Sequence, residues 1–210
     1  EMLARVPASD ATAWWDQGDF SFRLETPGTA DYPRLLRRPR SSGRGDNGSM
    51  ETVVLDLQAE NDAGDHDYTA SGLLVVSPDG RYLAWSVDHA GDEVYQLRFR
   101  DLSTGADLDE VVPRCYYGGA WSADSSSFLY TVHDQSYRPY QVRRHVLGTA
   151  VASDAVLFED LDDRLELELY GSRSGQWVIA DLRGRGFNEQ WLIPAADVTA
   201  APRLVRGREV

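Results

Sequence analysis

The chain has 210 residues, of which 42% are hydrophobic and 10% aromatic, a composition typical of a folded protein rather than a disordered one. A net charge of −13 argues against nucleic-acid binding, and no apolar run approaches the ~20 residues of a membrane helix. The single cysteine excludes a disulfide framework and favours a reducing compartment, so we expect a cytoplasmic protein.

The first quarter of the chain is predicted to hold short strands. The chain opens at Glu1 without the basic and apolar segments of a signal peptide, so we expect no leader and a piece of a longer protein. Alternation and apolar content predict strands at 20–24, 32–38 and 52–57. Residues 40–49 are polar and Gly-rich, and we interpret their RGD tripeptide as part of a loop rather than an adhesion signal.

A polar connection follows at residues 60–68. Its aspartates and its one histidine lack the alternating oxygen ligands and central glycine of a calcium loop, and one histidine does not make a zinc site. We therefore interpret it as a solvated loop and expect neither a metal nor another cofactor.

Residues 73–112 are the stretch around which the chain is organised. Four short apolar or alternating segments are joined by three tight turns rich in Gly, Asp and Ser. An antiparallel meander of about 40 residues is the repeating unit of a β-propeller blade.

The first of those turns recurs along the chain. SPDG at 77–80 is matched by SADS at 122–125 and, more weakly, by SRSG at 172–175, and each is followed by an aromatic, apolar strand. The spacings of about 45 and about 50 residues are those of propeller blades. The recurrence favours a propeller over a β-sandwich with similar hairpins.

The predicted fold class is all-β, an incomplete β-propeller built from four-stranded antiparallel blades. The approximate blades are 14–57, 73–112, 118–159 and 166–206, with a crossing between blades at 112–119. Propellers commonly have more than four blades, so the chain is expected to be part of a larger architecture.

The individual residues with chemical potential favour structural roles. Cys115 is interpreted as structural, His145 as a hydrogen-bonded strand histidine, and the acidic cluster at 159–163 as a solvated corner rather than an acid–base pair. The glycine pair 118–119 after two tyrosines indicates a close approach of the backbone to another element. The chain has no G-x-S-x-G, phosphate-loop or H-E-x-x-H motif.

Several motifs resemble one known family. They are VLDL at 54–57, SPDG through LAWSVD at 77–88, GAW at 119–121, and above all the V-x-R-H-x-L-G-T core within 138–149. Together they are similar to the N-terminal propeller of the prolyl oligopeptidase family of serine peptidases, and to its oligopeptidase B (protease II) branch in particular.

The resemblance implies a seven-bladed propeller that caps an α/β-hydrolase domain with a Ser–Asp–His triad. That domain is absent here, so no catalytic residue carries over, and the propeller would restrict entry to short peptides. Tyr116, five residues before Trp121, matches the position of an aromatic that lines the substrate pocket, and Tyr117 is the alternative. A tyrosine that packs between blades is the competing interpretation.

The resemblance further implies a parent enzyme that cleaves after basic residues, a preference that depends mainly on acidic residues of the absent domain. Two alternatives remain: a non-catalytic propeller module that binds a protein or peptide partner, and a proline-specific oligopeptidase. No nucleic-acid or membrane partner is expected. An open propeller exposes a sheet edge, so self-association is expected as well.

Overall fold

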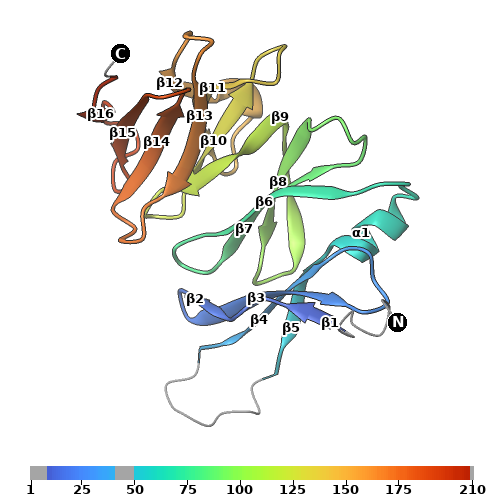
Figure 1. The fold of residues 1–210 in the computed structure, drawn as a ribbon. Coiled ribbons are helices and arrows are strands. Elements are labelled where there is room, and N and C mark those ends of the chain that lie inside the picture. The colour runs from blue at the N-terminus through green and yellow to red at the C-terminus, as the bar shows by residue number, and fades with distance from the viewer. Residues whose placement is uncertain (1–8, 41–49, 209–210) are drawn as a thin grey trace. The chain divides into compact units, whose positions relative to one another are not determined.

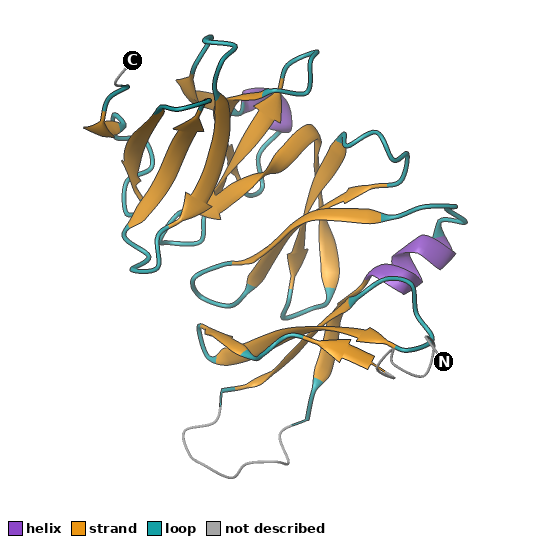
Figure 2. Ribbon diagram, viewed as in Figure 1, coloured by secondary structure: helices purple, strands orange, loops and turns teal. Residues whose placement is uncertain are grey.

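The computed structural model describes residues 9–40 and 50–208 and divides the chain into two units, Glu1–Thr69 and Ala70–Val210 (Figure 1). Strands make up nearly all of the regular structure in both (Figure 2). The RGD tripeptide Arg44-Gly45-Asp46 lies outside the described residues. No helix in the described ranges is long and apolar enough to cross a membrane.

The first unit is a five-stranded antiparallel sheet followed by one helix. In the sheet order β1-β3-β4-β5, β2 also pairs with β3. Phe22, Leu35, Leu55 and Leu57 are its most buried apolar residues. The elements are β1 (Ser9–Ala11), β2 (Trp15–Gln17), β3 (Phe20–Pro27), β4 (Arg34–Pro39), β5 (Thr52–Asp56) and α1 (Leu57–Ala63).

Helix α1 corrects the expectation of a solvated loop, because its last residues fall within the predicted polar connection. The Asp56 side chain accepts a hydrogen bond from the Ala59 N–H and so caps the helix N-terminus. Leu57 is buried, while the polar residues that follow are exposed or half-buried. Capping and one anchored residue therefore suffice to fold this short polar stretch.

The second unit contains two antiparallel sheets (Figure 1). The seven-stranded sheet has the order β12-β11-β10-β9-β8-β7-β6, and the four-stranded sheet has the order β13-β14-β15-β16. The strands are β6 (Ala70–Val76), β7 (Tyr82–Asp88), β8 (Tyr95–Asp101), β9 (Ala106–Trp121), β10 (Ser127–His133), β11 (Pro139–Val146), β12 (Ala155–Glu159), β13 (Glu166–Gly171), β14 (Trp177–Arg183), β15 (Asn188–Pro194) and β16 (Arg203–Arg206), with a short 3₁₀ turn at Val151–Ser153.

The recurrent turn has the same hydrogen bonding at all three positions. The hydroxyl of Ser77 accepts the N–H of Tyr82, that of Ser122 accepts the N–H of Ser127, and that of Ser172 accepts the N–H of Trp177. The fourth residue of each turn has a positive φ: 73° at Gly80, 61° at Ser125 and 69° at Gly175. The sequence repeat therefore reflects a repeated backbone conformation.

Strand β9 joins two groups of strands without a break. Its first half pairs with β8 and its second half with β10, and Cys115 is paired on both sides, opposite Tyr95 and Val132. Arg114 has a φ of 59°, so the strand changes direction there. The predicted crossing at 112–119 is thus itself part of the sheet, which satisfies backbone groups that a loop would leave to water.

Two apolar cores hold the second unit together. One joins β6–β8 to β9 and β10 through Phe99, Trp121 and Phe128, whose rings pack edge to face. The other joins the seven-stranded sheet to β13–β15, with Leu129 and Val142 packed among Leu167 and Leu169. Each strand group therefore buries its faces against the next group along the chain.

Candidate functional site

The two tyrosines predicted to line a substrate cleft lie side by side on β9. Tyr116 is half-buried and Tyr117 is 42% exposed, whereas Cys115 beside them is fully buried. The change of direction at Arg114 precedes them, so both rings lie where the strand changes pairing from β8 to β10.

The tyrosines are part of a continuous chain of rings. Tyr95 packs on Tyr117 with ring centroids 5.0 Å apart, and its hydroxyl donates to the Tyr117 hydroxyl at 3.0 Å. Tyr117 meets Tyr116 at 4.6 Å, Tyr116 meets His133 at 5.9 Å, and His133 stacks on Tyr137 at 5.2 Å. The packing fixes the Tyr116 and Tyr117 rings against a rigid base.

A pocket of about 390 Å³ opens beside these rings, and we call it the tyrosine pocket. Its other walls come from Gly118, Pro139 and the residues of β13 from Glu166 to Tyr170. Glu166, Glu168 and Tyr170 alternate with the buried Leu167 and Leu169, so strand geometry places them together on the exposed face.

Gly118 lets β9 and β13 approach closely at the base of the pocket. A Cβ at this position would lie 2.9 Å from the backbone nitrogen of Leu169, and one at Gly119 would lie 2.5 Å from the Phe128 ring. The close backbone approach predicted for the glycine pair is confirmed. Without it, the two strands that form the pocket could not meet.

The electrostatic field at the rings is negative. Burial raises the pKa of Tyr116, and the charges of Glu93 and Glu166 raise it further. Burial and the hydrogen bond to Tyr117 raise the pKa of Tyr95, with a further contribution from Asp88 and Glu93. Both tyrosines therefore stay protonated at neutral pH and act as hydrogen-bonding and packing groups.

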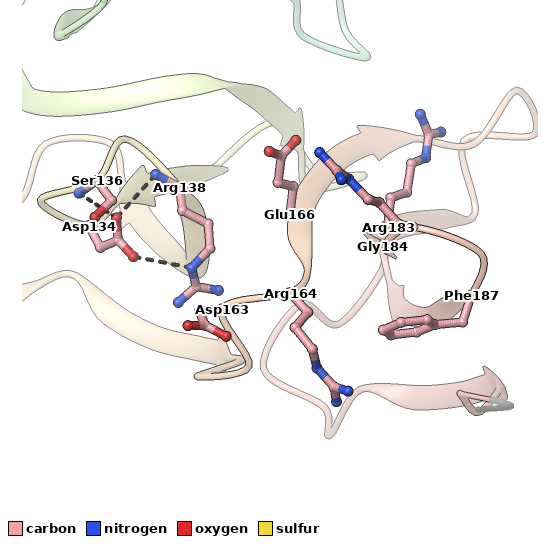
Figure 3. Close-up of a pocket in the computed structure, with 10 residues that line it drawn as sticks. Asp134, Ser136, Arg138, Asp163, Arg164, Glu166, Arg183, Gly184 and Phe187 are labelled. Carbon is pink, nitrogen blue, oxygen red and sulfur yellow. Dashed lines mark hydrogen bonds and ion pairs between the residues drawn. The ribbon is translucent and has the colours of Figure 1, made fainter.

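A second, larger pocket of about 900 Å³ shares Glu166 with the first, and we call it the arginine pocket (Figure 3). Four arginines line it: Arg138, Arg164, Arg183 and Arg185. Burial alone would raise the pKa of Asp134 there, but hydrogen bonds from the Arg138 and Ser136 N–H groups and from the Arg138 guanidinium lower it.

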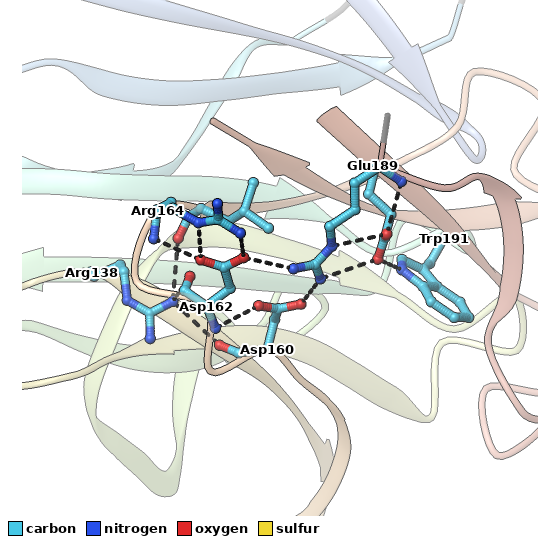
Figure 4. Close-up of polar contacts among 8 residues, drawn as sticks. Arg138, Asp160, Asp162, Arg164, Glu189 and Trp191 are labelled. Atoms are coloured by element: carbon cyan, nitrogen blue, oxygen red, sulfur yellow. Dashed lines mark hydrogen bonds and ion pairs between the residues drawn. The ribbon is translucent and has the colours of Figure 1, made fainter. Parts of the chain in front are cut away.

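The acidic cluster at 159–163 is a solvated corner only in part, because Glu159 and Asp163 are exposed whereas Asp160 and Asp162 are paired with arginine. Arg208 forms ion pairs with Asp160, Asp162 and Glu189 (Figure 4). A hydrogen bond from Arg164 lowers the pKa of Asp162. Asp160, Asp162 and Glu189 are therefore engaged in ion pairs with arginines, which indicates a structural role.

The remaining candidates have structural surroundings. Burial raises the pKa of the Cys115 thiol to about 12, which excludes a reactive thiolate. His145 is buried and bonded to Asp154 at 2.9 Å, as expected for a hydrogen-bonded strand histidine. Among the described residues, no group of three or more His, Cys, Asp or Glu side chains is placed to hold a metal ion.

Sequence reasoning does not identify the pocket residues on β13. It places Glu166, Glu168 and Tyr170 only within the predicted blade 166–206. The signal was present in the alternation of the ELELY stretch, which predicts one polar face, but nothing local shows that this face meets Tyr116 and Tyr117.

Comparison with known proteins agrees with this architecture. A family model described as "Prolyl oligopeptidase, N-terminal beta-propeller domain" matches residues 1–210. Protease 2 of Moraxella lacunata is 32% identical over 211 residues, which cover 99% of this chain and 30% of that protein. Dipeptidyl aminopeptidase BI of Pseudoxanthomonas mexicana is 27% identical over 213 residues, covering 93% of this chain and 28% of that protein.

Two solved structures share the fold. Oligopeptidase B from Leishmania major matches with a TM-score of 0.88 and 21% identity over 100% of this chain and 29% of its own. Oligopeptidase B from Trypanosoma brucei, with covalently bound antipain, matches with a TM-score of 0.84 and 24% identity over 100% of this chain and 29% of its own. The predicted fold class, an incomplete β-propeller, is confirmed.

The chain spans 28 to 30% of the length of these curated relatives. The family model matches the full extent of the chain, residues 1–210. The chain therefore belongs to the prolyl oligopeptidase family. It is a part of the N-terminal β-propeller of that family and is similar to the oligopeptidase B branch.

Proposed function

We propose that this chain is the propeller portion of a cytoplasmic serine-type oligopeptidase that cleaves after basic residues. Its role is to admit short peptides to a hydrolase domain that lies outside this chain and to keep folded proteins out. The family match over residues 1–210 carries the proposal. The tyrosine pocket supports it, because about 390 Å³ suits a side chain or a short peptide segment.

Hydrolysis by the full-length protein that contains this chain tests the proposal. We expect a fluorogenic peptide ending in Arg-Arg to be cleaved rapidly and a serine-reactive probe to label the protein. The same cleavage sequence placed within a folded protein should stay intact. Cleavage of a Gly-Pro peptide instead would favour the proline-specific alternative, and no cleavage with no labelling would favour a non-catalytic binding module.

Tyr116 and Tyr117 are proposed to contact the substrate in this enzyme. Tyr117→Ala in the full-length protein should raise KM roughly fivefold, the loss expected for one aromatic contact, with little change in kcat. Val156→Ala, which removes an exposed side chain on β12 outside both pockets, is the control. An unchanged KM in Tyr117→Ala would assign this tyrosine to packing.

The isolated 210-residue chain is also proposed to self-associate. Leu204 and Val205 are exposed on β16, whose outer edge pairs with no strand among the described residues. Unpaired edges with apolar side chains favour pairing between chains. Light scattering should show oligomers that Leu204→Lys reduces, and a clean monomer at high concentration would refute the idea.

A further inference from the structure

We propose that the tyrosine pocket binds the cationic side chain of a basic residue in a short peptide, with Glu166 supplying the charge that selects it. The inference rests on the proposed function for the short peptide as ligand. It adds a recognition site within this chain, apart from any acidic residues of the absent hydrolase domain.

The pocket walls have the chemistry that a guanidinium or ammonium group requires. Tyr116, Tyr117 and Tyr170 line the pocket, and an aromatic face attracts a cation through its quadrupole. Pro139 adds an apolar wall that suits the aliphatic stem of a long basic side chain, whereas the Leu167 and Leu169 side chains belong to the core on the other face of β13. The ring contacts from Tyr95 to His133 hold the first two tyrosines in place, so little ordering is needed on binding.

The charges of the pocket are negative and incompletely compensated. The Glu166 side chain has no ion pair or hydrogen bond with another described residue, although Glu166 lies opposite Arg183 in the β13–β14 ladder. Glu168, by contrast, is paired with the Arg183 guanidinium at 2.8 Å. Glu93 and Glu166 both raise the pKa of Tyr116, so their fields reach its ring. A cation in the pocket would give Glu166 the partner that it lacks.

The lining of the tyrosine pocket disfavours an anionic ligand. All 21 basic residues of the chain are arginines, yet none of the nine residues lining the tyrosine pocket is basic. Four arginines line the adjacent arginine pocket (Figure 3). The arginine pocket carries four arginines against three carboxylates, whereas the tyrosine pocket carries two carboxylates and no basic residue, with Glu166 shared between them. The net charge of −13 favours the approach of a cation.

Binding of two small amides to the 210-residue chain tests the proposal. N-acetyl-arginine amide carries the guanidinium, and N-acetyl-citrulline amide replaces it with a neutral urea of nearly the same shape. In an NMR or calorimetric titration, we expect the arginine amide to bind at least about fivefold more tightly. High salt should weaken binding of the arginine amide alone.

Substitutions locate the site. Glu166→Gln should weaken binding of the arginine amide about threefold to fivefold and leave the citrulline amide unchanged. Asp109→Asn, the same change of charge at an exposed position of β9 outside the pocket, should have no effect. Tyr170→Leu should weaken binding while Tyr170→Phe retains it, because the ring and not the hydroxyl attracts the cation.

The possible results separate this proposal from the proposed function. Arginine-selective binding that Glu166→Gln weakens supports the pocket even if the full-length protein hydrolyses neither fluorogenic peptide. Equal binding of the two amides overturns it even if that protein cleaves after arginine. Undetectable binding, or a Glu166→Gln variant that binds as tightly as the wild type, also overturns it.

Discussion

The buried hydroxyl of Tyr130 is held in a hydrogen-bond network whose stability contribution can be measured. It donates to Oδ2 of Asp154 at 2.9 Å, while Nδ1 of His145 bonds to Oδ1 of the same carboxyl at 2.9 Å. The His145 and Asp154 side chains are 0% and 1% exposed. Tyr130→Phe would leave one carboxyl oxygen without its partner where water cannot replace it.

The expected loss of stability follows from that burial. A hydrogen bond to a charged group contributes about 1.5–3 kcal/mol, and Asp154 keeps its bond to His145, so we expect Tyr130→Phe to lower the free energy of unfolding by about 2 kcal/mol. Phenylalanine retains the ring and leaves no cavity of consequence. The loss therefore reports the hydroxyl alone.

Urea unfolding of the 210-residue chain, followed by circular dichroism, measures the effect. Tyr137→Phe is the matched control: its side chain is 46% exposed, its hydroxyl bonds to no described residue, and its removal should change stability by less than about 0.5 kcal/mol. A Tyr130→Phe variant as stable as Tyr137→Phe would refute the prediction that the hydrogen bond from Tyr130 to Asp154 contributes about 2 kcal/mol to the free energy of unfolding.

Alkaline pH provides an independent test of the same network. Burial and the bond to Asp154 raise the pKa of Tyr130. The folded state thus holds this proton more tightly than the unfolded state. The contribution of the protonated hydroxyl to the free energy of unfolding is therefore complete below the unfolded pKa of about 10 and is lost as pH rises above it. Tyr130→Phe should lose less stability than the wild type over that range, and parallel curves would contradict this.

Three further predictions concern backbone and titratable groups. Gly175→Ala should cost about 1 kcal/mol because of its positive φ, whereas Gly171→Ala should be nearly neutral; equal Tm values would contradict this. Cys115 should resist alkylation at neutral pH until denaturant is added, and rapid labelling of the native chain would show that the thiol is accessible. Hydrogen bonds from Ser122 and Ser126 lower the pKa of Asp124, so its contribution is present above about pH 4 and lost on acidification. Asp124→Asn should therefore make the free energy of unfolding depend less on pH below about pH 4. The same pH dependence in the variant and the wild type would refute this contribution of Asp124.

Helix α1 shows where local sequence reasoning was incomplete. Asp56 and Leu57 carry ordinary signals of a helix start, a capping carboxylate followed by a helix former. The apolar run before them predicts a strand that extends through both residues. One residue, Asp56, both ends β5 and caps α1, and this dual role is clear only when the Ala59 hydrogen bond is seen.

The sequence by itself determined the all-β class, the repeated turns and the family. Alternation, turn residues and their spacing act over a few residues, and so they can be interpreted without knowing what packs where. The acidic residues of 159–163 show the limit, since their partner Arg208 lies more than forty residues away.

Only the tertiary structure decided the site. Tyr116 and Tyr117 were named by resemblance, but the pocket exists because Gly118 lets β9 meet β13 and because that meeting turns Glu166 and Tyr170 toward the same cavity. These residues are about fifty positions apart, and their contact depends on how two sheets pack on a shared apolar core. No local pattern specifies such packing, because it arises from burial summed over many strands.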